Sequence, residues 1–359
     1  MADIKPFRAV RYAGAAGSLT DLVAPPYDAV DEEERAALYS LSPYNVVHVT
    51  LPESAEEAAR LYHAWLEEGI LESEESPAQW LAVEDYVGPD GVARQRHGLV
   101  VSLLAAPYGT GAVLPHERTH PRIRDERLEL LRALRVQPEP IFLLADAAIP
   151  LELPARPADL EVGGTRLWRT HNGSAPGLET AQLLVADGHH RYESAVALGE
   201  ELDAPVRIMA LVVSVEDPGL HVFPTHRTFS GRPDLREPAG AQRCDSLEEA
   251  LALLALEPDG RAAAVAFRRG GIELVRGAEG ELDTELVDRH GLDGIGYTPR
   301  ADDVVAAVDS GLADVAFLLR EPRVETIFDA ARCGRRMPPK STYFFPKPLS
   351  GLLFHPVTT

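Results

Sequence analysis

Hydrophobic positions along the chain follow two repeats, the twofold repeat of strands and the three-to-four-residue repeat of helices. Two alternating runs, residues 79–85 and 94–104, flank the turn-forming sequence Gly-Pro-Asp-Gly at 88–91 and predict a β-hairpin. Leucines recur at threes over residues 128–134, which predicts a helix after the proline-bounded loop 115–121. The first part of the chain therefore combines paired strands with helices.

Local signals mark further elements. Asp31 and Ser54 are each followed three residues later by a glutamate, a capping-box pattern that predicts the start of a helix. Short strands are predicted at 7–12 and at the β-branched run 46–50. Later strands are expected at 140–145, 181–186, 205–214, 262–268, 272–276 and 313–318, and helices at 190–201, 246–256, 299–310 and 322–333.

This mixture favours an α+β fold with mixed sheets and helices over a regular doubly wound sheet. Residues 150–180 are rich in proline, glycine and threonine and show little periodicity. They either join two lobes, residues 1–150 and residues 175–359, or form one long loop.

The amino-acid composition indicates which classes of binding partner and which cellular compartment to expect. The formal net charge of −21 repels polyanions, so DNA or RNA is not expected as a partner. Cys244 and Cys333 have neither a CxxC nor a Cys/His spacing, so neither a disulfide framework nor a cysteine-type zinc site is expected. No signal-peptide pattern and no run of about 18 apolar residues is present. A cytoplasmic location without membrane attachment is expected, and the oligomeric state stays open.

The strongest chemical signal is the DGHHR segment, which follows the buried-strand pattern of residues 183–186 and comprises Asp187, Gly188, His189, His190 and Arg191. A strand-to-helix turn suits phosphate, because the helix N-terminus offers unpaired N–H groups and partial positive charge. The glycine lets the backbone approach a ligand, and the arginine adds a guanidinium. Asp187 can hold an amine, a metal ion or a hydroxyl proton. The alternative is that Asp187 caps a helix and the histidines lie on the surface.

A second polar segment, HERTH, has His116, Glu117 and His120 in the HExxH spacing of zinc proteases. That spacing needs a helix, and the prolines at 115 and 121 oppose one. We expect instead a loop that carries His116, Glu117 and Thr119 into a pocket, with ordinary surface polarity as the alternative.

Three more segments place polar groups on proline-stiffened loops, a feature of preorganised sites and of plain connectors alike. They are APPYD at 24–28, PTHR at 224–227 and PPKST at 338–342, and they contribute Asp28, His226 and Lys340. The glycines of a Walker loop are missing around Lys340, and no GxGxxG follows a strand, so neither a P-loop nor a Rossmann site is predicted. Arg8, on a predicted strand, is a candidate for a substrate carboxylate.

These segments together resemble a known family. APPYD at 24–28, HERT at 116–119, DGHHRYE at 187–193, PTHR at 224–227 and KSTYFFPK at 340–347 occur in order over the whole chain. In this they resemble the bacterial and archaeal proteins classed as domain of unknown function 1015. The resemblance implies that residues 1–359 form one family unit, but the family name implies no reaction.

The DGHHR turn is also similar to the DGHTR turn of the ParB-like free serine kinases and to the GCHR turn of sulfiredoxin. This resemblance implies a ParB/sulfiredoxin-like core in which residues 188–191 hold nucleotide phosphates and Asp187 faces the acceptor. It makes Asp28 the counterpart of the kinases' acidic base, with Asp in place of Glu. His190 replaces the kinases' threonine, which leaves the donor open. Sulfiredoxin chemistry is not expected, because His189 stands where the cysteine is required. ParB-type DNA partition is not expected either, since the charge has the wrong sign and no helix-turn-helix is evident.

The leading hypothesis is a small-molecule kinase that transfers a phosphoryl group from ATP, ADP or pyrophosphate to a hydroxyl metabolite, with free L-serine as the best guess. Asp28 is the expected general base, and Asp187 orients the acceptor or a Mg²⁺ ion that accompanies the donor. This scheme requires Asp28 and Arg191 to face one site. The other candidates are Glu117 as a further catalytic residue, Gly188, His189, His190, Arg191, His226 and Lys340 for the donor, and Arg8, His116 and Thr119 for the substrate.

Two alternatives stay open. One is a nucleotide-sensing protein without turnover. The other is a zinc-dependent hydrolase that uses the HERTH segment.

Overall fold

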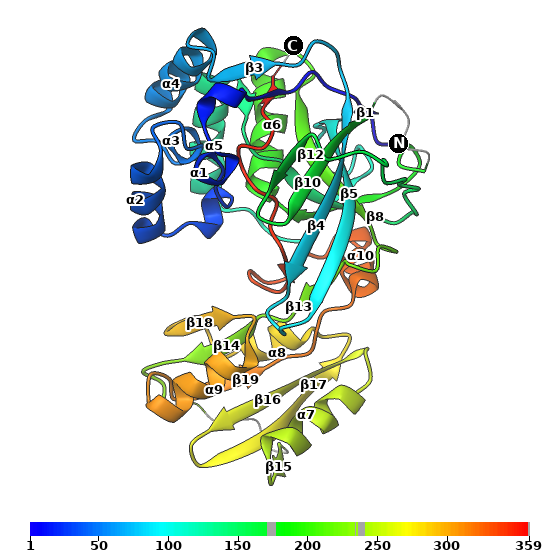
Figure 1. The fold of residues 1–359 in the computed structure, drawn as a ribbon. Helices are drawn as coiled ribbons and strands as arrows, with labels where there is room; N and C mark the ends of the chain where they lie inside the picture. Colours follow the sequence, from blue (N-terminus) through cyan, green and yellow to red (C-terminus); the bar gives the residue numbers. More distant parts are fainter. Residues whose placement is uncertain (171–176, 234, 236–240, 358–359) are drawn as a thin grey trace.

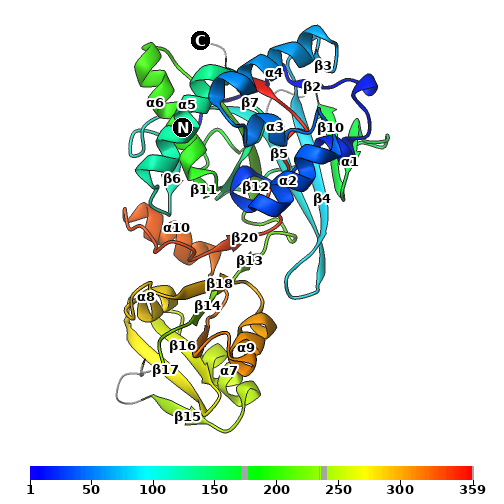
Figure 2. The same ribbon diagram turned by 90° about the vertical axis from the view of Figure 1, so that its left-hand side faces the viewer.

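A computed structural model describes residues 1–170, 177–233, 235 and 241–357. Within these residues the chain forms a larger and a smaller mixed assembly of strands, each flanked by helices (Figures 1 and 2). The expected mixture of sheets and helices is therefore confirmed. In the described part of the chain, no helix is both long enough and apolar enough to cross a membrane.

The larger sheet has nine strands among the described residues, taken from widely separated parts of the chain. Their order is β6 (Val113–Pro115), β11 (Leu183–Asp187), β8 (Ile141–Ala145), β12 (Arg207–Ser214), β5 (Ala93–Leu104), β4 (Gln79–Val87), β10 (Thr165–Thr170) and β9 (Leu160–Val162), with β1 (Ile4–Lys5) paired to β5. The β4–β5 pair is the predicted antiparallel hairpin, whereas β12 runs parallel to β8 and β11 runs parallel to β6.

The sheets do not follow the expected lobes 1–150 and 175–359. Strands β11 and β12 pair with β6, β8 and β5, all of which come from the first 150 residues. A strand pairs with whichever neighbour satisfies its backbone hydrogen bonds, regardless of distance along the chain. The segment 150–180 is also not a plain linker, because it contributes β9 and β10; its residues 171–176 lie outside the described residues.

Helices cover both faces of the larger sheet. On one face α5 (Pro121–Leu134) and α6 (His189–Leu202) pack through Leu131, Tyr192 and Leu198. On the other face α10 (Val324–Arg332) packs through Ile327 and Phe328. A further layer beside α5 consists of α1 (Leu19–Leu22), α2 (Glu32–Leu41), α3 (Val47–Thr50) and α4 (Ala55–Glu67), together with β2 (Val10–Tyr12) paired to β3 (Leu71–Ser73) (Figure 1).

The smaller sheet lies below the larger one in Figure 1. Its order is β15 (Gln242–Cys244), β17 (Gly271–Glu279), β16 (Arg261–Arg268), β19 (Val315–Leu318), β14 (His226–Phe229) and β18 (Ile295–Thr298). Alternate residues of β16 pack against α8 (Asp283–Asp288) on one face and against α7 (Leu247–Leu256) and α9 (Ala301–Ser310) on the other. The alternation follows from the twofold side-chain repeat of a strand.

The C-terminal segment returns from the smaller sheet to the larger one. Strand β20 (Tyr343–Phe344) pairs with β13 (Val222–Phe223) where the two sheets adjoin (Figure 1). Beyond it, Ser350 pairs with Ala24, and β21 (His355–Pro356) pairs with β7 (Val136–Gln137). The C-terminal segment therefore lies beside residue 24 and beside strand β7.

The local signals have mixed outcomes. Asp31 and Ser54 each accept a hydrogen bond from the N–H group three residues later, so both predicted helix starts are confirmed. The strand predicted at 46–50 is wrong, because Val47–Thr50 forms α3. The Asn45 side chain accepts from the N–H of Val47, and the valines are buried in the helical layer. Packing here outweighs the weak strand preference of β-branched residues.

An ion pair inside the larger sheet reaches the C-terminal segment. Arg96 on β5 is fully buried and donates to Glu84 on β4 at 2.8 and 2.6 Å. The same guanidinium donates to the carbonyl of Pro346 at 2.8 Å. The sheet interior thereby holds the residue that precedes Lys347.

We expect Arg96→Met to destabilise the fold strongly, because it leaves Glu84 buried without its cation. Breaking a buried pair in this way costs about 3–5 kcal/mol in the free energy of unfolding, measurable by urea denaturation. The double variant Arg96→Met/Glu84→Gln should recover part of that loss. As a control, Arg122→Met removes an exposed pair with Glu126 and should cost at most about 1 kcal/mol. If Arg96→Met and Arg122→Met lowered the free energy of unfolding equally, the buried Arg96–Glu84 pair would not have the stabilising role proposed for it.

Candidate active site

Three charged side chains from distant parts of the chain meet at one point. The Nζ atom of Lys347 lies 2.8 Å from Oδ2 of Asp28 and 2.9 Å from Oδ1 of Asp187. Asp28 lies in a short turn, Tyr27–Ala29, and Asp187 ends β11. The structure thus brings Asp28 and Asp187 together, whereas Arg191, which was expected to face the same site as Asp28, lies buried behind Asp187.

The turn after β11 needs a glycine. Gly188 has a φ of 92°, in the left-handed region that favours glycine, and it precedes the first residue of α6. A Cβ atom at this position would lie 2.7 Å from Cγ2 of Ile141. No side chain caps the helix start. The first N–H groups of α6 therefore have no side-chain acceptor among the described residues.

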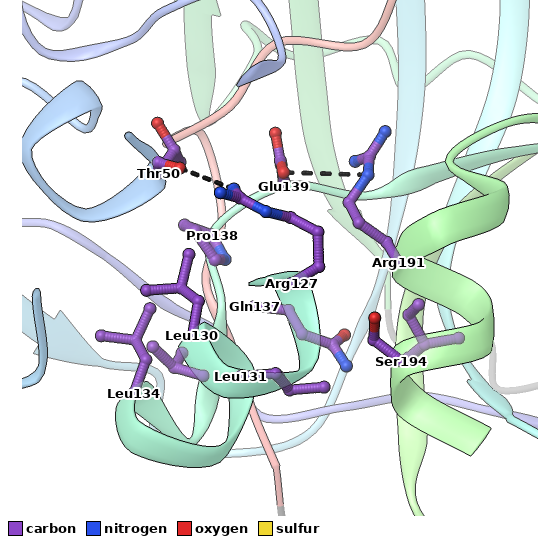
Figure 3. Close-up of a pocket in the computed structure, with 12 residues that line it drawn as sticks. Thr50, Arg127, Leu130, Leu131, Leu134, Gln137, Pro138, Glu139, Arg191 and Ser194 are labelled. Atoms are coloured by element: carbon purple, nitrogen blue, oxygen red, sulfur yellow. Dashed lines mark hydrogen bonds and ion pairs between the residues drawn. The ribbon is translucent and has the colours of Figure 1, made fainter. Parts of the chain in front are cut away.

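Arg191 is the third residue of α6, and its guanidinium forms hydrogen bonds to other groups of the protein. Its guanidinium donates to Oδ2 of Asp187 at 2.8 Å and to the carbonyl of Pro140 at 2.6 Å. Its Nε atom lies 3.7 Å from Oε1 of Glu139 (Figure 3). Burial alone would lower the pKa of Arg191, but Glu139 and Asp187 outweigh burial and raise it. Arg191 thus fixes the carboxylate that begins the turn.

Exposure decreases steadily along this cluster. The exposed fraction of the side chain is 36% for Asp28, 19% for Lys347, 14% for Asp187 and 9% for Arg191. A ligand therefore reaches the cluster from the Asp28 side.

Asp28 and Lys347 each stabilise the charged form of the other. Burial would raise the pKa of Asp28, but the charges of Lys347 and Arg191 outweigh it and lower that pKa. Burial would likewise lower the pKa of Lys347, but Asp187 and Asp28 outweigh it and raise it. At neutral pH Lys347 is therefore a charged ammonium and Asp28 a carboxylate.

Two candidates extend the charged cluster. Glu117 lies on a bridge to Met337, and burial raises its pKa, while Lys340 acts in the opposite direction. Lys340 is exposed, adopts a left-handed backbone with a φ of 58°, and its charge also lowers the pKa of Asp28. Glu117 therefore lies within electrostatic reach of Asp187, and Lys340 lies within electrostatic reach of Asp28.

His116 is buried and uses both ring nitrogens. Its Nδ1 lies 2.7 Å from the carbonyl of Val185, and its Nε2 lies 3.0 Å from Oγ1 of Thr342. A carbonyl can only accept, so Nδ1 carries the proton and Nε2 accepts from the threonine. Burial lowers the pKa of His116 to about 4. This neutral histidine ties the HERTH loop to β11 and to the C-terminal segment.

The two histidines of the DGHHR turn differ in exposure. His189 is buried, accepts a long hydrogen bond of 3.4 Å from the N–H of His116, and has a pKa lowered by burial. His190 is half-buried, and its Nε2 accepts from the N–H of His120 at 2.9 Å. His190 is therefore the turn histidine that can still present a ring nitrogen to a ligand.

The HERTH segment is a loop, as predicted. Helix α5 begins only at Pro121, with His120 as its N-cap residue. Thr119 donates to Glu193 of α6 at 2.6 Å, which binds the loop to the helix after the turn.

Two candidates lie apart from the cluster. His226 is buried on β14 of the smaller sheet, where its Nδ1 accepts from the N–H of Leu319. It lines a separate hollow of about 580 Å³ beside Arg300. Arg8 is exposed between β1 and β2, and it takes part in none of the contacts that join the cluster. No contact of the described residues joins either side chain to Asp28 or Asp187.

The cluster does not fit a metal site in this arrangement. Each oxygen of Asp187 accepts from a cation, one from Lys347 and one from Arg191. Across the described ranges, no group of three or more His, Cys, Asp or Glu side chains is placed to hold a metal ion.

Sequence reasoning missed Lys347 and Glu139. Lys347 belongs to the KSTYFFPK segment, but a lysine on a loop carries no chemical signature of its own. Glu139 follows the short strand β7 and accepts from Ser350 at 2.8 Å and from the N–H of Tyr27 at 3.4 Å. The signal that could have found Lys347 is its place directly after the aromatic and proline run at 343–346, where it is the first charged residue after Lys340.

Comparison with known proteins identifies a family but no activity. The family model described as "Protein of unknown function (DUF1015)" matches residues 4–275. No protein with a curated description matches the chain.

Solved structures give only weak similarity. A conserved hypothetical protein from Pyrococcus furiosus is 17% identical, with a TM-score of 0.41 over 68% of this chain and 90% of its own. A free serine kinase in complex with AMP is 16% identical, with a TM-score of 0.43 over 70% of this chain and 91% of its own. SbnI with a C-terminal truncation, from Staphylococcus aureus, is 14% identical, with a TM-score of 0.39 over 65% of this chain and 79% of its own. Similarities at these levels assign no activity to this chain.

Acid should weaken the fold through His116. Its pKa in the folded state is about 4, below the value of 6.5 for an unperturbed histidine, so the unfolded chain binds protons first as the pH falls. Stability that is complete above pH 6.5 is therefore lost between about pH 6.5 and pH 4, by up to roughly 3 kcal/mol for this residue. Urea denaturation at pH 7 and pH 5 measures the loss.

The His116→Gln variant should lose less stability than the wild type between the same two pH values. The matched control is His63→Gln on α4, where the ring is exposed. An undiminished loss in His116→Gln would assign the acid sensitivity to other groups.

Proposed function

The chain belongs to the family described as protein of unknown function DUF1015, and we propose that it is a small-molecule kinase. The proposed reaction transfers a phosphoryl group from ATP, ADP or pyrophosphate to the hydroxyl group of a small metabolite. The observation that carries the proposal is the ammonium group of Lys347 between Asp28 and Asp187 at the start of α6.

Donors for phosphate oxygens converge at this point. An ammonium has three N–H groups, and the two aspartates accept from two of them, which leaves one for a phosphate. The uncapped N–H groups of His189 and His190 add the partial positive charge of the helix start. Nε2 of His190 accepts from the backbone, so its Nδ1 carries the proton and can donate as well.

Arg191 acts from behind the turn in this scheme. Its hydrogen bonds go to Asp187 and Pro140, so its positive charge stabilises phosphate without direct contact. Its second task is to hold Asp187 in place.

Asp28 is the proposed general base. Its carboxylate is ionised and is the most exposed group of the cluster, so an acceptor hydroxyl can approach it. As the acceptor oxygen attacks phosphorus, its proton passes to Asp28, and the bond from phosphorus to the donor's leaving oxygen breaks with its electron pair on that oxygen. A loose transition state of this kind needs positioning and charge neutralisation more than a strong base. Lys347 and the start of α6 supply the neutralisation.

The finer assignments rest on the DGHHR resemblance. Free L-serine as acceptor and a ParB/sulfiredoxin-like core come from its similarity to the DGHTR turn of serine kinases. Glu117 and Lys340 are proposed to line the acceptor side, because their charges reach Asp28 and Asp187. Mg²⁺ enters only as a companion of the donor's phosphates, and no step of the reaction uses a protein-bound metal ion.

The alternatives are less well supported. A zinc hydrolase would need His116 and His120 on one helix face, but they lie on a loop and both ring nitrogens of His116 have partners. A nucleotide-sensing protein would use the same anion site, and turnover alone separates it from a kinase.

We expect Asp28→Asn to lose phosphoryl transfer. Removing a general base lowers kcat by roughly 10²–10⁴-fold. Phosphorus NMR of the protein with L-serine and, in turn, ATP, ADP or pyrophosphate measures the product. Asp309→Asn, an exposed aspartate at the end of α9, is the matched control and should keep full activity. Binding of a donor without product, for the wild type, would support the nucleotide-sensing protein and contradict the kinase.

Replacing Lys347 should shift the acidic limb of the pH–rate profile. The charge of Lys347 lowers the pKa of Asp28, so Lys347→Met raises that pKa and moves the limb to higher pH. The measurement is kcat/KM against pH, with Lys5→Met, an exposed lysine, as control. An unshifted limb in the Lys347→Met enzyme would show that Asp28 is not the titrating base.

A further inference from the structure

A small cavity lies behind Arg191, on the side away from Lys347. It has a volume of about 50 Å³ and lies between α5 and α6 (Figure 3). Arg127 of α5 and Arg191 of α6 border it, together with Glu139 on the segment between them. None of Asp28, Asp187 and Lys347 lines it, so it is separate from the proposed phosphate site.

Two donors of this cavity lack an acceptor. The Nε–H groups of Arg127 and Arg191 are both buried and have no hydrogen-bond partner among the described residues. The 3.7 Å between Nε of Arg191 and Oε1 of Glu139 is too long for a hydrogen bond. Arg191 as a whole is more than nine-tenths buried. An unpaired buried donor costs about 1–3 kcal/mol, so the pair points to an acceptor that binds there.

The charge of the lining also calls for an anion. Arg127 donates to the carbonyl of Thr50 at 2.8 Å and lies over the ring of Tyr27. It forms no ion pair within the described residues. The charge of Arg191 already has the carboxylates of Asp187 and Glu139 beside it, so Arg127 is the cation of the lining without a carboxylate partner among the described residues. A ligand with one negative charge would supply that partner.

Most of the remaining lining is apolar, although Thr50, Gln137 and Ser194 also border the cavity. Five aliphatic side chains line it, namely Leu130, Leu131, Leu134, Val136 and Ile208. One water molecule occupies about 30 Å³ of the liquid, so the volume suits a ligand of only a few non-hydrogen atoms. A ligand with an anionic head group and a short aliphatic tail would place the head group on the arginines and the tail against the aliphatic side chains.

We propose that this cavity binds a short-chain aliphatic carboxylate, with its carboxylate oxygens on the Nε–H groups of Arg127 and Arg191 and its tail against the leucines of α5. Such a ligand would share Arg191 with the phosphate site, since the same guanidinium holds Asp187 on its other side. The two sites would then be coupled through one side chain. The inference concerns binding alone and does not depend on phosphoryl transfer.

Isothermal titration calorimetry with propionate tests the proposal on the whole chain without any phosphate donor. We expect saturable 1:1 binding, roughly millimolar or tighter for a ligand of this size, and no binding of the neutral isostere propionamide. Arg127→Met should weaken propionate by about tenfold or more, because it removes a charged donor. Arg132→Met on the same helix, whose arginine is paired with Glu201 at the surface, should bind as the wild type does.

Three results would overturn the proposal. They are no propionate binding to the wild type, equal binding of propionamide, or full affinity in a folded Arg127→Met variant. The first two need no variant, so the test holds even where Arg127→Met fails to fold. Loss of kinase activity in any assay would leave these outcomes unaffected.

Discussion

Lys347 carries a positive charge into a place where two carboxylates would otherwise face each other. Without a cation between them, Asp28 and Asp187 would repel each other. The ammonium of Lys347 removes that repulsion; burial would raise the pKa of Asp28, but Lys347 and Arg191 outweigh burial and lower it. The charge of Asp28, the proposed general base, and the meeting of the two aspartates both depend on this one contact.

The position of Lys347 depends in turn on the interior of the larger sheet. Arg96 is fully buried and holds the carbonyl of Pro346, the residue before Lys347. Beyond Lys347, Ser350 pairs with Ala24, close to the turn that carries Asp28. The C-terminal segment is therefore part of the candidate site, because contacts on both sides of Lys347 hold it against the rest of the fold.

Arg191 lies between the charged cluster and the cavity beside Glu139. Its Nη2 atom donates to Asp187 in the cluster, while its Nε atom lies beside Glu139 in the lining of the cavity. A guanidinium suits such a position, because its donors point in several fixed directions and its charge persists when buried.

Local patterns in the sequence determined most of the elements. Helix caps, the β4–β5 hairpin and the strand–turn–helix of the DGHHR segment depend on neighbouring residues, so their signals lie within a few positions. The tertiary structure alone decided that residues 46–50 form a helix, that β11 and β12 join the first sheet, and that Lys347 meets Asp28 across 319 positions. Those outcomes follow from packing and charge pairing between distant segments, which no local pattern encodes.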